Sequence, residues 1–346
     1  MAFEYLTNVP LEKARQDYLD ALQSVGLKAS SETLLTLEAT NRVTACAVYA
    51  RISSPHYNAC AMDGIALRAS QTFGATETTP VRLPEGTFQW VNTGDPLPEG
   101  CDAVVMVEDV VQEEDAVVLY AAAVPWQNVR QIGEDISAGD MILPSYSVLT
   151  PAAIGALLES GVLAVEVITQ PKVGIIPTGN EIVPPTENPR EGDIIESNSA
   201  IFSGMLQEWG CKVQVYPPVG DSPDLIEAAL RQALAECDAV VLNAGSSAGR
   251  KDYSLDAIRN VGEVVLHGVA IKPGKPAILA YARSTEDNRV QPILGLPGYP
   301  VSGILVLEQL FRPVIEQLTR RPAAKPQFIQ AQITRRLTSS LKYYEF

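Results

Sequence analysis

The segment PKVGIIPTG (171–179) begins a stretch in which apolar runs of strand length alternate with helical patterns. The alternation continues through SNSAIFSGMLQEWG (197–210), KVQVYPPVG (212–220), SPDLIEAALRQALAEC (222–237) and DAVVLNAGSSAG (238–249). Residues 264–282 and 291–318 supply further strands and a closing helix. Neighbouring parallel strands need a crossover connection, usually a helix, and the helices cover both faces of the sheet. The stretch therefore predicts a doubly wound parallel α/β domain over residues 171–318.

The residues before this domain predict helices on either side of a small β region. Residues 10–26 have helical periodicity, and we expect a second helix near Ser31–Leu37 followed by a strand over residues 41–50. From 47 to 129 short β runs are separated by Gly and Pro, which is typical of a small β domain. A helix is expected over Thr150–Gly161, with the Thr as N-cap and a Pro at the first helical position.

Together these segments predict a multidomain α/β plus β protein. We expect the helix near residue 150 to rejoin the N-terminal helices, so the β region is interpreted as an insertion. The expected domains are an N-terminal elongated linker domain with helices (1–46 and 130–170), an inserted small β domain (47–129), the α/β domain (171–318) and the start of a C-terminal β domain (319–346).

The composition narrows the classes of function. The formal net charge is −15, which argues against general nucleic-acid binding because that needs a basic face. No apolar run approaches the roughly 18 residues of a membrane span, and the N-terminus lacks an apolar signal core, so we expect a cytoplasmic protein without a membrane partner. The five cysteines form no CxxC pair, and two histidines make a His-based zinc site or a Ser-His-Asp triad improbable. Any metal should therefore have carboxylate ligands, which favours magnesium.

Four loops that follow strands of the α/β domain are candidates for a ligand site. They are Thr178–Glu181, Asn243–Gly249, Lys272–Lys275 and Leu296–Pro300. Ligands of open α/β sheets bind outside the carboxyl ends of the strands. Glycines let backbone N–H groups approach a phosphate, and two lysines would gather positive charge in an acidic protein. Taken singly, the Thr-Gly and LPGYP loops are more typical of ordinary turns and KPGKP is equally compatible with one, but the concentration of all four loops at strand ends favours a phosphate-bearing small molecule.

Three carboxylates lie just beyond the predicted strand ends. Glu181, Asp221 and Asp252 are candidates to hold a magnesium ion or to orient a water molecule.

The β region contributes a second group of polar residues. Asp63 precedes a glycine in a tight turn, Thr93 and Gly94 form a second turn, and Arg130 lies five residues before Asp135. A structural interpretation stays open for each group beside a role in the site. Asp63 is then a turn aspartate bonded to backbone, and Arg130 and Asp135 pair with each other.

The order of these motifs along the chain is specific. MDG, TG-x-x-LP-x-G-x-DAVV-x-x-E, R-x-x-GED, TG-x-E, a helix opened by SN, a Gly/Ser loop, KPGKP and LPG-x-P-V-S follow one another between about residues 5 and 346. In this order they resemble the molybdopterin molybdenumtransferases, the MoeA or gephyrin E-domain type of enzyme. The resemblance implies a MogA-like α/β domain and a role in molybdenum cofactor biosynthesis.

The resemblance also implies a reaction and its residues. Such enzymes use a divalent cation, Mg²⁺, to cleave adenylylated molybdopterin, insert molybdenum from molybdate and release AMP. They work as homodimers, with the α/β domain of one subunit facing the β domain of the other, beside partner proteins of molybdenum cofactor synthesis. The implied catalytic residues are Asp63, Asp135, Glu181, Asp221 and Asp252, of which Glu181, Asp221 and Asp252 are the metal ligands. The implied residues for binding the pterin phosphate are Thr93, Gly94, Arg130, Thr178, Gly179, Gly245, Ser246, Ser247, Lys272, Gly274, Lys275, Pro297, Gly298 and Pro300.

Several positions depart from the family pattern. Asn180 stands where Asp is usual, Asn243 begins an altered Gly/Ser loop, Tyr299 replaces an Asn, and Cys60 replaces a Ser. The C-terminal β domain is barely begun, so we expect a divergent member that lacks most of that domain. Two alternatives stay open: a non-catalytic sensor of molybdopterin or molybdate built on the same fold, and a scaffold that uses the domain only to dimerise.

Overall fold

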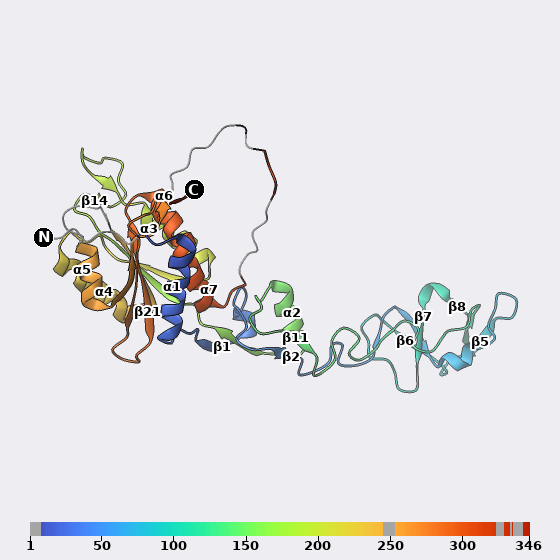
Figure 1. The fold of residues 1–346 in the computed structure, drawn as a ribbon. Coiled ribbons are helices and arrows are strands. Elements are labelled where there is room, and N and C mark those ends of the chain that lie inside the picture. Colours follow the sequence, from blue (N-terminus) through green and yellow to red (C-terminus); the bar gives the residue numbers. More distant parts are fainter. Residues whose placement is uncertain (1–7, 245–252, 323–328, 333, 335–341) are drawn as a thin grey trace. The chain divides into compact units, whose positions relative to one another are not determined.

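The structure is a computed structural model that describes residues 8–244, 253–322, 329–332, 334 and 342–346. Its contacts divide the chain into two compact units, residues 1–32 with 167–346 and residues 33–166. Figure 1 shows the elements of both units. None of the helices in the described ranges is long and apolar enough to cross a membrane.

The first unit is built on a mixed sheet. Among the described residues its strand order is β16-β13-β17-β21-β20-β18. The sheet strands are β13 (Lys172–Pro177), β16 (Lys212–Val215), β17 (Ala239–Ala244), β18 (Glu263–His267), β20 (Ile278–Arg283) and β21 (Val290–Pro297). Strands β16, β13, β17 and β21 are parallel, whereas β20 is antiparallel to both of its neighbours. The doubly wound α/β domain is thus confirmed, with one reversed strand.

Helices cover both faces of this sheet. They are α1 (Leu11–Ser24), α3 (Asn198–Glu208), α4 (Pro223–Glu236), α5 (Tyr253–Val261), α6 (Pro300–Val306) and α7 (Arg312–Thr319), with the π-helical turn η4 (Leu307–Phe311) joining the last two. Side chains of α1, α3, α6, η4 and α7 share one buried cluster with the strands, and those of α4 and α5 share another on the opposite face. Apolar residues at helical spacing explain this packing, as Ile226, Leu230 and Ala233 are the buried residues of α4.

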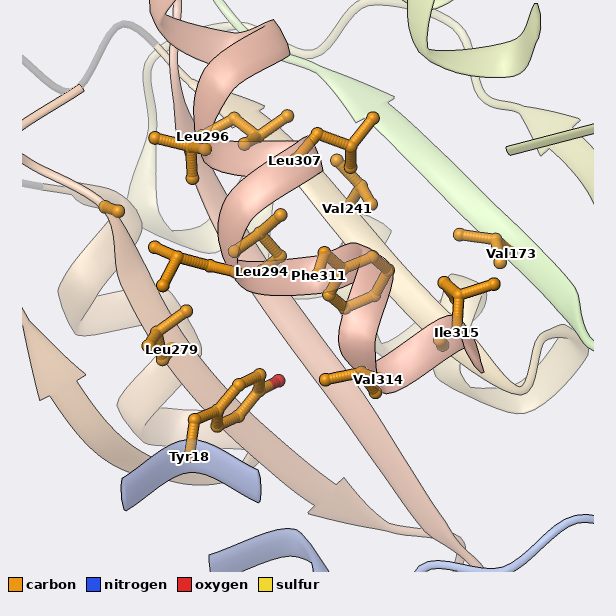
Figure 2. Close-up of a cluster of buried hydrophobic side chains, with 14 of the residues drawn as sticks. Tyr18, Val173, Val241, Leu279, Leu294, Leu296, Leu307, Phe311, Val314 and Ile315 are labelled. Carbon is orange, nitrogen blue, oxygen red and sulfur yellow. The ribbon is translucent and has the colours of Figure 1, made fainter. Parts of the chain in front are cut away.

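Helix α1 contributes to the core of the α/β unit. Figure 2 shows Tyr18 of α1 in the buried cluster with Leu279 and Val314. The Tyr18 hydroxyl donates hydrogen bonds to the carbonyl oxygens of Ala280 at 2.8 Å and Ile293 at 3.2 Å. Burial raises the pKa of this phenol far above its usual range. The N-terminal helix is therefore anchored to the sheet. The division of the chain into four domains stays a prediction.

The second unit contains the small β region. In the described chain its strands are β2 (Val48–Tyr49), β3 (Ala59–Cys60), β4 (Gly64–Leu67), β5 (Val81–Pro84), β6 (Gln89–Val91), β7 (Ala103–Met106), β8 (Val110–Gln112), β9 (Ala116–Leu119), β10 (Val129–Arg130) and β11 (Met141–Leu143). They pair in the orders β6-β4-β7, β5-β9-β8, β10-β3 and β11-β2. Short turns η1 (Thr36–Glu38), η2 (Ala69–Thr72) and η3 (Val107–Asp109) and the helix α2 (Pro151–Glu159) lie in the same unit. The predicted N-cap holds, because the Thr150 side chain accepts a hydrogen bond from the Ala153 amide at 3.2 Å.

Two local predictions were wrong. The helix expected near Ser31–Leu37 is instead the strand β1 (Ser31–Leu35), which pairs with β12 (Ala164–Ile168). Its side chains alternate between exposed and half-buried, because the distant partner strand overrides the local helical pattern. The strand expected over 41–50 is reduced to β2 and an isolated bridge at Val43.

Short strands also flank the sheet of the first unit. β14 (Ile182–Val183) pairs in parallel with β15 (Ile194–Ile195). β19 (Ile271–Lys272) pairs in parallel with β22 (Tyr344–Glu345), so the last described residues add a strand to the α/β unit.

Candidate functional site

The strand order reverses beside β13, and this point locates the candidate site. β13 lies between β16 and β17 in the sheet. The chain therefore crosses from β13 to β16 on one side of β13, and the next strand of this sheet, β17, pairs on the other side of β13. The Thr178 amide donates to the Asn243 carbonyl at 2.9 Å, and the Gly179 amide donates to the Val219 carbonyl at 3.0 Å. Three strand-end loops therefore meet here, as expected for the crevice of an open α/β sheet.

The acidic edge of this site is formed by the loops after β13 and β16. Gly179 has φ +144°, and a Cβ there would lie 3.0 Å from Glu181 Oε1. Asn180 Oδ1 accepts a hydrogen bond of 3.2 Å from the Asp221 amide. Glu181 and Asp221, both exposed, are thus carried by two loops that Asn180 joins directly. The Asn that departs from the family pattern has a structural role as a link between these loops.

Four of the predicted site residues lie outside the described residues. They are Gly245, Ser246 and Ser247 of the Gly/Ser loop and Asp252 beyond it. Within the described ranges no group of three or more His, Cys, Asp or Glu side chains is arranged to hold a metal ion. Mg²⁺ commonly takes one or two protein carboxylates together with substrate phosphates, and the assignment of Glu181 and Asp221 as its ligands stays a prediction.

The LPGYP loop reaches the same strand ends. Pro297 is the buried last residue of β21, opposite Ala244, and Gly298 and Pro300 are exposed beyond it. Tyr299 is 77% exposed, so its ring is available to a ligand rather than packed in the core.

The KPGKP loop carries both predicted lysines. Gly274 has φ +116°, and a Cβ there would lie 2.8 Å from Val306, so this loop is packed closely on α6. Lys272 Nζ lies 3.6 Å from Glu345 Oε1, and Lys275 Nζ lies 5.9 Å from the centroid of the Tyr343 ring. Both cations thus contact the last described segment of the chain.

The second unit brings Asp63 and Thr93 together. Asp63 Oδ1 accepts from the Thr93 amide at 2.6 Å and from the Thr93 hydroxyl at 3.0 Å. These bonds, chiefly that of the amide, hold the pKa of the Asp63 carboxyl below its usual value. Gly94 continues the turn with φ +91°, and its amide donates to the Cys60 carbonyl at 2.8 Å. The Asp63 carboxylate therefore does bond to backbone, but to the amide of Thr93 in a second turn rather than within its own turn.

Arg130 joins two carboxylates in the same unit. Its Nε donates to Glu134 at 2.9 Å and its terminal nitrogen to Asp135 at 2.5 Å. The hydrogen bond with Glu134, followed by the charge of Asp135, raises the pKa of the guanidinium. The expected Arg130–Asp135 pair is present, and Glu134 is a partner that the sequence had not assigned.

Asn198 and Ser199 are buried polar residues that sequence reasoning did not assign to the site. Asn198 Nδ2 donates to the Gly298 carbonyl at 2.8 Å and to Asn243 Oδ1 at 3.4 Å. These bonds join the start of α3 to the ends of β17 and β21. The SN motif at the start of α3 was the signal in the sequence that could have identified them.

Comparison with known proteins agrees with this architecture. A model described as "MoeA N-terminal region (domain I and II)" matches residues 9–161, and one described as "Probable molybdopterin binding domain" matches residues 174–317. The molybdopterin molybdenumtransferase of Haemophilus influenzae is 31% identical over 350 residues, covering 97% of this chain and 84% of the relative. That of Synechococcus elongatus is 32% identical over 84% of this chain and 76% of its own length.

A solved structure has the same fold over most of the chain. The molybdopterin biosynthesis MoeA protein from Pyrococcus horikosii has a TM-score of 0.78 and 30% sequence identity, over 91% of this chain and 81% of that one. The motif order, the two matched regions and the shared fold agree, and the chain belongs to the MoeA family of molybdopterin molybdenumtransferases.

Proposed function

We propose that this chain acts in molybdenum cofactor biosynthesis as a molybdopterin molybdenumtransferase. Its substrates are adenylylated molybdopterin and molybdate, and AMP is released. The observation that carries the proposal is the meeting of the loops after β13, β16 and β17 at the sheet's switch point, where the first of these loops carries Glu181 and the second carries Asp221. Family membership supplies the reaction, and the retained carboxylates favour turnover over a purely sensory role.

The chemistry required of these residues is hydrolysis of a phosphoanhydride. Water adds to the phosphorus on the molybdopterin side, the bond between that phosphorus and the bridging oxygen breaks, and AMP leaves with the bridging oxygen. Glu181 and Asp221, with Asp252, would hold Mg²⁺, which supplies neutralisation of the developing phosphate charge. Lys272 and Lys275 would bind the phosphate oxygens, which an acidic protein must attract with locally gathered cations.

The second unit would complete the cleft. We infer that Asp63, Thr93, Gly94, Arg130 and Asp135 face the α/β unit of a partner subunit in a cytoplasmic homodimer. The hydrogen bonds between Asp63 and Thr93 and between Arg130 and Asp135 fix these side chains before any ligand binds.

AMP release tests the proposal. The chain is incubated with adenylylated molybdopterin, molybdate and Mg²⁺, and AMP is measured by chromatography. We expect AMP release that requires Mg²⁺ and falls at least about 100-fold in Glu181→Ala, because a ligand of the charge-neutralising metal is lost. Glu187→Ala, an exposed carboxylate of the same segment, is the matched control and should keep native turnover. Tight binding without AMP release would establish the sensor instead, and native turnover in Glu181→Ala would remove the assigned metal ligand.

A further inference from the structure

Four buried polar side chains meet at the ends of β13 and β17 and the start of α3. The exposed fractions are 4% for Thr178, 7% for Asn198, 3% for Ser199 and 6% for Asn243. A polar cluster this deeply buried is unusual unless its hydrogen-bonding groups are satisfied.

The cluster retains two unsatisfied groups. Among the described residues, Asn198 Oδ1 and Ser199 Oγ are buried without a hydrogen-bond partner. The Asn198 amide cannot be turned around, because its Nδ2 donates to the Gly298 carbonyl at 2.8 Å, and an oxygen there would face another oxygen. Asn198 Oδ1 is therefore a fixed acceptor that requires a donor from outside this set of residues.

The charge beside this acceptor excludes a phosphate as its natural partner. The Glu196 carboxylate accepts a hydrogen bond of 2.8 Å from the Ser199 amide at the first turn of α3. A negative charge already occupies this helix end, so a second anion would be repelled. A neutral group with N–H donors suits both the orphaned acceptor and the neighbouring carboxylate.

We propose that Asn198, supported by Ser199, recognises the donor edge of the pterin: its 2-amino group and adjacent ring N–H. This specificity role rests on the proposed function, since it places the pterin ring at the start of α3 and leaves the phosphates to the lysine-bearing loop and to the Mg²⁺ that Glu181 and Asp221 would hold. Asn243 then acts as a positioning residue, because its Oδ1 holds the Asn198 amide at 3.4 Å.

Two small fluorescent probes test the assignment. Pterin carries the 2-amino donor, whereas lumazine has a carbonyl oxygen at that position. The intact chain is titrated with each probe, and Kd is measured for both. We expect pterin to bind at least about tenfold more tightly than lumazine, since a buried acceptor is left unpaired by the analogue. In Asn198→Ala the two Kd values should become about equal, because pterin binds more weakly while the Kd of lumazine stays unchanged.

Matched variants separate recognition from folding. Ser199→Ala removes an unpartnered hydroxyl, so it should keep native thermal stability and still lower the pterin preference about threefold. If Asn198→Ala does not fold, the pterin preference of Ser199→Ala tests the proposal in its place. Ser203→Ala removes another α3 hydroxyl that is buried without a hydrogen-bond partner among the described residues, and it should leave the preference unchanged.

The outcomes distinguish this inference from the proposed enzyme activity. Equal affinities of the native chain for the two probes, or a preference that survives both Asn198→Ala and Ser199→Ala, would overturn it. Loss of AMP binding in Asn198→Ala with pterin binding intact would also overturn it, because the residue would then recognise adenine. A chain that prefers pterin but releases no AMP would support this inference and contradict only the activity.

Discussion

Replacing Gly179 by Ala tests whether the Thr178–Gly179 turn holds Glu181 in place. At φ +144° an Ala is strained, and its Cβ would lie 2.7 Å from Ile182 Cγ1 and 3.0 Å from Glu181 Oε1. Backbone strain of this kind costs about 1–3 kcal/mol. In a unit of this size each kcal/mol lowers Tm by about 2–4 °C, so we expect a decrease of about 2–12 °C. The Glu181 carboxylate must also move away from the turn.

Thermal unfolding and a Mg²⁺ titration of AMP release measure the two effects. We expect Gly179→Ala to need a higher Mg²⁺ concentration for half-maximal rate. Gly204→Ala is the matched control, because this exposed helical glycine has nothing within 4 Å of an added Cβ. It should raise stability by about 0.5–1 kcal/mol and leave the Mg²⁺ dependence unchanged. A Gly179→Ala chain with native Tm and native Mg²⁺ dependence would refute the reasoning.

Further predictions concern both units. Tyr18→Phe should lower the stability of the α/β unit by about 1–2 kcal/mol in urea unfolding, because two buried carbonyl oxygens lose their hydroxyl partner; an unchanged midpoint would contradict the anchoring of α1. Gly64→Ala should unfold the β unit at a lower temperature by calorimetry, since its Cβ would lie 1.9 Å from the Val105 carbonyl oxygen. The Asp63 carboxyl, monitored by NMR, should titrate below the usual value of 3.8, and Thr93→Ala should raise its pKa towards that value. Because the folded pKa is lowered, this stabilisation is present above about pH 4 and is lost as the pH falls through the folded pKa.

The elements of the α/β unit were predictable where a local pattern carried the information. Apolar runs such as Val173–Pro177 predicted buried strands, and the Thr150 cap predicted the start of α2. The strand at Ser31–Leu35 was missed because its pairing partner is more than 120 residues away in sequence, beyond any local window. The reversed strand β20 was missed for the same reason: strand direction depends on pairing rather than periodicity.

For the candidate site, the sequence by itself determined the family, the motif order and most of the chemically competent residues. Their types and spacing are covalent properties that a chain shows without folding. Only the tertiary structure decided which residues meet. It joined Asn180 to the Asp221 loop, paired Asp63 with Thr93, and buried Asn198 Oδ1 without a partner among the described residues. Hydrogen-bond satisfaction and burial are properties of atoms brought together from distant segments, so no pattern along the chain could have revealed that orphaned acceptor.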